Sequence, residues 1–313
     1  HASQNLLQIT TNLVPVISIS FIFLFMISLF GEKIEAAFNK IKIPNLIRTS
    51  ETDKFPEVKF ITRWWKLVLL GVFAFALLVR VYNLGLPDSF YFDEVYHAFT
   101  AREILRGNPA SWEWWNTPPE GFAYEWTHPP LAKLGMTLGM KVFGENSFGW
   151  RFPGAILGVG SVIMVFFITK EIFKDDLTGI LASSIFALDG LPLVMSRIGM
   201  NDGYFLFFIL LALLMFLKDK YFFSSLVFGL AAASKWSTIW LVPIFVAAHF
   251  ALRKKFKINY FWYLLIPPLI YLATYMPMFL SGHSWGEYIE VQKQMWRYHT
   301  NLKAEHSYSS PWW

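Results

Sequence analysis

Long runs of apolar residues, separated by short polar segments, dominate the hydropathy pattern of the chain. The run at 205–217 (FLFFILLALLMFL) is apolar on every side and has no polar face to turn toward water. A bilayer-spanning helix needs about 20 largely apolar residues. The pattern predicts eight such helices, at 12–30, 64–82, 151–170, 177–195, 203–217, 221–234, 236–252 and 260–280. The predicted fold is therefore an all-α integral membrane protein built as a multi-span helical bundle.

The composition supports the same class of protein. Hydrophobic residues make up 55% of the 313 positions and charged residues only 16%, against about 25% charged in soluble domains. The net charge of +5 does not indicate nucleic-acid binding, because the basic residues lie in short loops between apolar runs, as membrane orientation requires. The absence of cysteine excludes disulfides, cysteine-based zinc sites and thiol nucleophiles.

The basic loops predict the orientation in the membrane. Residues 31–63 carry seven Lys and Arg, and 253–259 carry four, so both segments are expected in the cytoplasm. The long loop 83–150, with four basic and eight acidic residues, is then external, as is the tail 281–313. Because the loops alternate between the two sides of the membrane, this orientation requires that 131–148 does not span the bilayer. Its weak apolar pattern with two lysines predicts a juxtamembrane helix at the interface.

Two units are expected on this basis. Residues 1–63 form an extra N-terminal span with a cytoplasmic linker, and 64–313 form a transmembrane module with the external loop 83–150. The first span could alternatively be a secretory signal or an anchor. The start at His1, without a methionine, and the end at Trp313 suggest a fragment or a processed product.

Two motifs of the external loop carry candidate chemistry. In YFDEVYH, Asp93 and Glu94 are adjacent carboxylates framed by aromatic residues, and partial burial would make such a carboxylate a better base. The competing interpretation is an acidic helix N-terminus. In THPPLAK, His128 and Lys133 are expected at the lipid–water boundary, where Lys133 could meet a lipid phosphate. The competing interpretation is a snorkelling lysine and a capping histidine.

Further charged residues stand at predicted span edges on the same external face. They are Arg151, Arg197, Asp202 and Lys235, each of which could also serve only to anchor a helix end. Asp189, at membrane depth, is expected to pair with a cation rather than to catalyse. Carboxylates and cations at an apolar face suit an anionic lipid headgroup. A sugar linked through phosphate to a polyprenol has a good leaving group, so it needs a base and phosphate-binding cations but no general acid.

The order of six motifs resembles the polyprenyl-phosphate-dependent GT-C glycosyltransferases, closest to the protein O-mannosyltransferases. The motifs are YFDEVYHA, THPPLAKLG, FGWRFPGAILG, SRIGMNDGYFLFF, ASKWSTIW and HSYSSPWW. The resemblance implies a GT-C-type bundle that transfers mannose, with inversion, from polyprenyl- or dolichyl-phosphate-mannose to Ser or Thr hydroxyls of proteins. It implies action outside the cytoplasm, in a microbial cell membrane or, for a eukaryotic member, the endoplasmic reticulum membrane.

The same resemblance implies roles for individual residues. Asp93 is expected as the catalytic base, with Glu94 assisting substrate placement, and Asp202 is a second acidic candidate. The donor phosphate and lipid are expected to contact Arg151, Arg197, Lys133, His128 and Lys235. No cofactor is implied with certainty, no metal ligands are expected, and the need for a divalent metal stays open.

The resemblance is incomplete at both ends. Residues 1–63 have no counterpart in the family, whose members continue into further C-terminal spans. Three other functions stay open: a sister GT-C transferase that glycosylates lipid or cell-wall glycan, a transporter or flippase, and a non-catalytic scaffold. A transporter would place its charges and helix breaks near the bilayer midplane, where Pro267-Pro268 is the main interruption here. The sugar, the lipid carrier, the acceptor proteins and the oligomeric state are not predicted.

Overall fold

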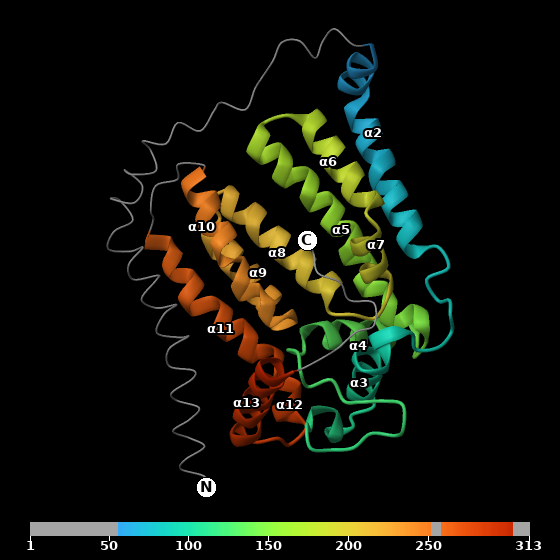
Figure 1. Ribbon diagram of the computed structural model, residues 1–313, viewed down its shortest axis with the longest axis vertical. Helices are drawn as coiled ribbons and strands as arrows, with labels where there is room; N and C mark the ends of the chain where they lie inside the picture. The colour runs from blue at the N-terminus through green and yellow to red at the C-terminus, as the bar shows by residue number, and fades with distance from the viewer. Residues whose placement is uncertain (1–55, 252–257, 303–313) are drawn as a thin grey trace.

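The computed structural model describes residues 56–251 and 258–302 (Figure 1). The predicted span at 12–30 and the final motif HSYSSPWW lie outside the described residues. The helices are α2 Pro56–Val81, η2 Phe92–Val95, α3 His97–Leu105, η3 Pro109–Trp112, α4 Leu131–Phe143, α5 Ser147–Phe173, α6 Asp176–Leu188, α7 Gly190–Arg197, α8 Asp202–Leu217, α9 Tyr221–Ser234, η4 Trp236–Leu241, α10 Val242–Ala251, η5 Ile258–Phe261, α11 Trp262–Thr274, α12 Met276–Leu280 and α13 Trp285–Asn301.

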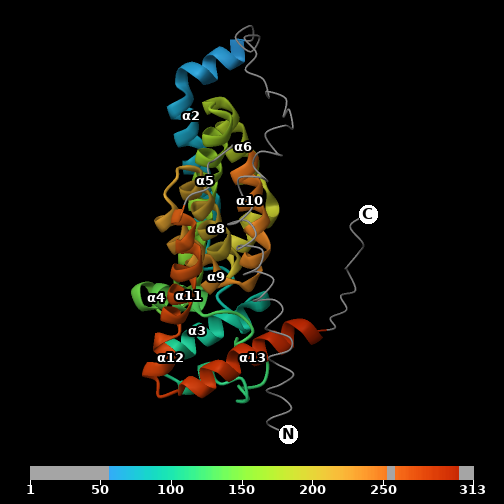
Figure 2. The same ribbon diagram turned by 90° about the vertical axis from the view of Figure 1, so that its left-hand side faces the viewer.

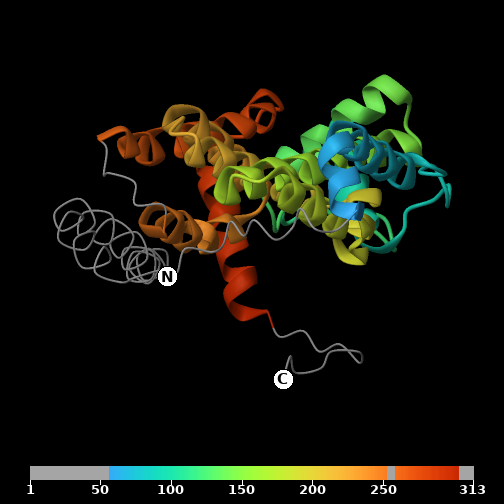
Figure 3. The same ribbon diagram turned by 90° about the horizontal axis from the view of Figure 1, so that it is seen from above.

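The helices form a bundle with a cap at one end. In Figure 1, α2, α5, α6, α8, α9, α10 and α11 run side by side along the long axis, while α3, α4, α12 and α13 gather at the lower end. Figure 2 shows α13 lying across that end rather than along the bundle. Seen from above in Figure 3, the bundle is elongated, with α2 (blue) at one side and α10 and α11 (orange) at the other. Between them, α5 packs against α2, α4, α6 and α8. The described part of the chain is helical and contains no strand.

The lengths of the helices show which of the predicted spans are long enough to cross a membrane. Within the described residues, Ser147–Phe173 and Ile258–Leu280 are long and apolar enough to cross a membrane, and the bent pair α6–α7 makes a third if it counts as one span. The apolar helices α8 and α9 have only 16 and 14 residues. The juxtamembrane prediction for 131–148 corresponds to α4 and the start of α5, with α4 in the cap.

The predicted span 177–195 is broken in the structure. α6 and α7 meet at an angle of 60°, and Asp189 stands between them, where its Oδ1 accepts a hydrogen bond of 2.9 Å from the backbone N–H of Leu191. Asp189 therefore caps α7. The predicted pairing of Asp189 with a cation is wrong, since among the described residues it forms no ion pair and its side chain is exposed. By contrast, α11 continues through Pro267 and Pro268.

A close approach of two backbones joins the cap to the bundle. A Cβ atom added at Gly139 of α4 would lie 2.3 Å from the backbone oxygen of Gly149 and 2.6 Å from Cγ of Pro153, both in α5. No side chain larger than hydrogen fits there unless the helices separate. Glycine at this position therefore lets α4 lie directly on the first turns of α5.

We expect Gly139→Ala to destabilise the protein by about 1–3 kcal/mol, the usual cost of overpacking. Gly71→Ala is the matched control, because nothing lies within 4 Å of a Cβ at this exposed position of α2. The control should be neutral or slightly stabilising, since alanine favours a helix over glycine. Thermal unfolding of the purified protein in detergent measures both effects, and equal melting temperatures for the two variants would contradict the packing argument.

Candidate active site

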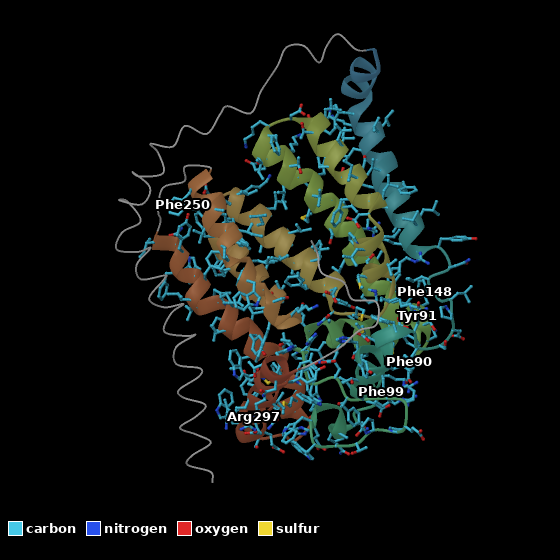
Figure 4. All side chains as sticks on the ribbon, in the orientation of Figure 1. Phe90, Tyr91, Phe99, Phe148, Phe250 and Arg297 are labelled. Atoms are coloured by element: carbon cyan, nitrogen blue, oxygen red, sulfur yellow. The ribbon has the colours of Figure 1, made fainter. Side chains whose placement is uncertain are left out.

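The two adjacent carboxylates of the motif YFDEVYH have different surroundings. They lie on the short 3-10 turn η2, which Phe92 enters with a φ of +54°. Phe90, just before the turn, stacks on Trp150 of α5 with ring centroids 4.7 Å apart, and it lies in the cap (Figure 4). Glu94 is 0% exposed, whereas Asp93 is only half-buried. One turn of backbone thus sends one carboxylate inward and leaves the other accessible.

Glu94 forms a buried, bidentate ion pair with Arg151. Nε of Arg151 donates to Oε1 at 2.7 Å and Nη2 donates to Oε2 at 2.6 Å. The backbone N–H groups of Gly199 and Tyr91 also donate to this carboxylate, at 2.7 and 2.9 Å. The rest of the guanidinium donates to backbone oxygens, those of Leu84, Pro87 and Ser89.

Arg151 is therefore saturated by protein groups. A guanidinium has five N–H donors, the protein acceptors account for them, and the side chain is 2% exposed. The predicted contact of Arg151 with the donor phosphate does not fit this arrangement, nor does direct substrate placement by the fully buried Glu94. The geometry makes both of them positioning residues for the turn that carries Asp93.

Arg197 is also engaged by the protein. At the end of α7 its guanidinium donates to the backbone oxygens of Val79 and Tyr82, the latter at 2.9 Å. These carbonyls belong to the end of α2, where a cation complements the helix dipole. Beside it, Arg80 is fully buried. These bonds use two of the five N–H donors of the guanidinium, and the side chain is partly exposed, so the role of Arg197 at the donor phosphate stays a prediction.

Asp93, in contrast, faces charged groups without bonding to them. Within the described residues its carboxylate forms no hydrogen bond or ion pair. Burial raises its pKa above the usual range, and the charges of Glu125 and Asp202 raise it further, while Lys235 acts in the opposite direction. Asp93 is the accessible carboxylate of the pair, with the raised basicity that a general base needs.

Asp202 and Lys235 form an ion pair next to Asp93. Nζ of Lys235 lies 2.8 Å from Oδ1 of Asp202. The pairing follows from the packing of α8 against α9: the helices are antiparallel, so the start of α8 meets the end of α9. Both side chains are partly exposed. Lys235 has three N–H donors and uses one of them here, so it can bind a further anion.

The motif THPPLAK folds around a buried lysine. Nζ of Lys133 donates to the backbone oxygens of Glu125 and His128, the latter at 2.8 Å, and the side chain is buried. Burial lowers the pKa of Lys133 to about 8, although Glu125 opposes that shift. The predicted contact of Lys133 with a lipid phosphate does not fit, because the ammonium is held inside the loop.

Sequence reasoning missed Glu125 and His97. Oε1 of Glu125 accepts hydrogen bonds from Thr127 Oγ1 at 2.6 Å and from the backbone N–H of His128 at 2.9 Å. Its Oε2 lies 4.0 Å from Nε2 of His97. Burial lowers the pKa of His97 to about 4, an effect that the charge of Glu125 partly offsets. The only feature of the sequence that could have indicated Glu125 as a site residue is its position three residues before His128.

The end of α13 also reaches the site and was not predicted. Nε2 of His299 donates to the backbone oxygen of Thr127 at 2.9 Å, and its ring stacks on His128 with centroids 5.3 Å apart. The neighbouring Tyr298 meets Trp126 edge to face at 5.7 Å. Figure 4 places Arg297, the preceding residue, at the cap end of the molecule. The sequence had placed 281–313 only in an external tail.

The structure thus brings together Asp93, His128, Asp202 and Lys235, and adds Glu125, His97 and the end of α13 to them. Among the described residues, no group of three or more His, Asp or Glu is arranged to hold a metal ion. The arrangement offers an accessible base, Asp93, and a partly exposed cation, Lys235, at the junction of the bundle and the cap.

Comparison with known proteins gives matches over the same region. The family described as dolichyl-phosphate-mannose-protein mannosyltransferase matches residues 70–300. Polyprenol-phosphate-mannose–protein mannosyltransferase of Mycobacterium tuberculosis is 30% identical over 257 residues, covering 66% of this chain and 48% of that protein. The protein of the same description from Mycolicibacterium smegmatis is 25% identical over 311 residues, covering 76% and 59%. The chain therefore spans about half the length of these relatives.

Two further matches concern the fold and a related activity. A solved structure of the S. cerevisiae protein O-mannosyltransferase Pmt1–Pmt2 complex bound to the sugar donor matches with a TM-score of 0.56 and 21% identity, covering 69% of this chain and 34% of that chain. This likeness confirms the predicted GT-C-type bundle. An undecaprenyl phosphate-alpha-4-amino-4-deoxy-L-arabinose arabinosyl transferase of Pseudomonas paraeruginosa is 25% identical over 268 residues, covering 80% and 46%.

Removal of one partner of the buried pair should mainly affect stability. We expect Arg151→Met to destabilise the protein by about 3–5 kcal/mol, because it leaves the fully buried Glu94 unpaired. The double variant Glu94→Gln/Arg151→Met should recover part of the loss. Arg297→Met, at a partly exposed position of α13, is the control and should be nearly neutral. A normal melting temperature combined with weak donor binding in Arg151→Met would instead restore the phosphate role.

Proposed function

Because the chain belongs to the dolichyl-phosphate-mannose-protein mannosyltransferase family, we propose that it transfers mannose from a polyprenyl- or dolichyl-phosphate-mannose to Ser or Thr hydroxyls of proteins. The observation that carries this proposal is the placement of Asp93, an unbonded and partly buried carboxylate with raised pKa, next to the ion pair of Asp202 and Lys235. The partners are thus a lipid-linked sugar, a protein acceptor and the membrane lipid.

The reaction is a single displacement at the anomeric carbon. The acceptor hydroxyl oxygen forms the new bond to that carbon as the bond to the phosphate oxygen breaks, which inverts the configuration. The proton of the hydroxyl passes to Asp93, and the bonding pair leaves with the polyprenyl phosphate. Since a phosphate is a stable leaving group, no general acid is required. One base and a cation for the phosphate are sufficient.

Of the predicted phosphate ligands, Lys235 suits the role best. Arg151, Arg197 and Lys133 donate to protein acceptors. His128 lies between the rings of His97 and His299. Lys235 is partly exposed, and among the described residues its ammonium group bonds only to Asp202. Its charge also acts on Asp93, so base and phosphate ligand lie on the same site.

The active site is proposed to face away from the cytoplasm, in a microbial cell membrane or in the endoplasmic reticulum membrane of a eukaryote. The support comes from the basic loops of the sequence and from α5, a 27-residue helix that is long and apolar enough to cross a membrane and that separates the cap from the turn at Lys174. In this proposal residues 1–63 form an added span with its linker, and 64–313 form the catalytic module.

A sister transferase that glycosylates lipid is the second candidate, favoured by the match to the arabinosyl transferase. The two functions differ in the acceptor. Purified protein in lipid, supplied with radiolabelled polyprenyl-phosphate-mannose, should transfer label to a Ser/Thr peptide under the proposed function. Label that appears only in added glycolipid would favour the second candidate.

We expect Asp93→Asn to lower the rate of mannose transfer about 10²–10⁴-fold, because the amide cannot accept the proton. Donor binding should stay within a few-fold. The raised pKa also predicts the pH profile: kcat/KM should fall as the pH drops through a value above the about 3.9 of an ordinary aspartate, since the base acts in its charged form. If Asp202→Asn abolished turnover and Asp93→Asn did not, the base would be Asp202.

Single cysteines test the orientation, since the chain has none of its own. Glu120→Cys lies in the exposed loop of the cap and Lys174→Cys lies in the exposed turn at the other end of α5. A membrane-impermeant thiol reagent applied to intact cells should label only the first variant, and after lysis it should label both. Labelling of Lys174→Cys alone in intact cells would place the site in the cytoplasm.

A further inference from the structure

Three aromatic side chains from separate segments meet at Tyr298, near Asp93. Tyr96 follows the turn η2, Trp126 lies in the loop before α4, and Tyr298 lies near the end of α13. The ring of Tyr298 meets that of Trp126 edge to face at 5.7 Å. Burial raises the pKa of the Tyr298 phenol, and the charges of Glu125, Tyr96 and Asp93 raise it further. Tyr298 thus lies close to Trp126 and to the proposed base.

These rings remain available to a ligand. Tyr96 is 41% exposed and Tyr298 is 38% exposed, and neither hydroxyl has a hydrogen-bond partner among the described residues. Tyrosine and tryptophan offer flat apolar faces together with polar edges, and they are enriched where proteins bind polypeptides. No Lys or Arg belongs to this group, so it is not built for a phosphate or an anionic headgroup.

The group is also held in place before any ligand binds. His299, next to Tyr298, fixes the end of α13 through its bond to Thr127 and its stack on His128. His128 in turn donates its backbone N–H to the carboxylate of Glu125. A platform that is already ordered loses less entropy when it binds a flexible chain. α13 lies across the end of the bundle (Figure 2), so its residues reach Asp93 from beyond the spanning helices.

We propose that Tyr96, Trp126 and Tyr298 form the platform on which the acceptor polypeptide binds, with its Ser or Thr hydroxyl directed at Asp93. This inference rests on the proposed function and assigns the two substrates to different sides of the base. The phosphate of the donor lies at Lys235, at the helix ends of the bundle, and the polypeptide lies against the cap. Tyr298 is a specificity residue that contacts the acceptor but takes no part in proton transfer.

Steady-state kinetics with a synthetic peptide that carries a single Thr test this assignment. Tyr298→Ala should raise the KM for the peptide roughly tenfold, the effect of losing one good aromatic contact, and leave the KM for polyprenyl-phosphate-mannose unchanged. Tyr298→Phe keeps the ring and should change the peptide KM by only about two- to threefold.

Two further variants serve as controls. Tyr82→Ala removes an exposed tyrosine at the end of α2 that has none of these contacts and should change neither KM. Lys235→Ala should show the reverse pattern, with a raised donor KM. An unchanged peptide KM in Tyr298→Ala, or a rise in the donor KM alone, would overturn the platform while mannosyl transfer by the wild-type protein still supports the proposed function. A wild-type protein that transfers no mannose to any peptide would overturn both.

Discussion

The site depends on the buried ion pair between Glu94 and Arg151. Burial of two charges costs several kcal/mol for each ion, and the pair is favourable only where the remaining polar atoms are also satisfied. Here the carboxylate accepts from Arg151, Gly199 and Tyr91, and the guanidinium donates to Leu84, Pro87 and Ser89 as well. One pair thus fixes the segment after α2, the turn η2, the start of α5 and the link between α7 and α8. The pair therefore joins four segments that are distant in sequence, and the position of Asp93 follows from it.

The adjacent carboxylates divide two tasks that a single residue cannot perform. A carboxylate that is saturated by donors holds the backbone well but is a poor proton acceptor, because its charged form is already stabilised. A carboxylate that accepts no hydrogen bonds is a better base, but it does not hold the backbone in place. On the tight turn η2 the two side chains point in different directions, so Glu94 is fully buried while Asp93 remains accessible. Two further carboxylates, Glu125 and Asp202, act on Asp93 and raise its pKa. The turn therefore couples a rigid support to a reactive group one residue away.

The sequence could predict the apolar helices of the bundle and the residue types near the membrane face, but not the helix α13 or the partners of the charged side chains. Apolar periodicity was sufficient for α5, and the weak pattern with two lysines was sufficient for α4. Neither pattern predicts the hydrogen-bond partners of Arg151. These partners depend on where the carbonyl groups of residues 84–89 point, and no local pattern reveals that direction. The break at Asp189 depends on a capping bond within an apolar run. Tyr298 and His299 were missed because tertiary packing alone brings α13 to a loop about 170 residues earlier.

The unequal lengths of the helices explain why a polar site can exist at this end of an apolar bundle. A Cβ at Gly203, the second residue of α8, would lie 3.5 Å from the backbone oxygen of Gly154. α8 therefore begins beside the second turn of α5, about 10 Å along that helix from its start at Ser147, at 1.5 Å per residue. The antiparallel α9 ends at the same level, which brings Lys235 to Asp202 at the start of α8. In the proposed function the lipid-linked phosphate approaches Lys235 from the bilayer and the polypeptide approaches Asp93 from the cap, so the two proposed substrates meet at the ends of these short helices.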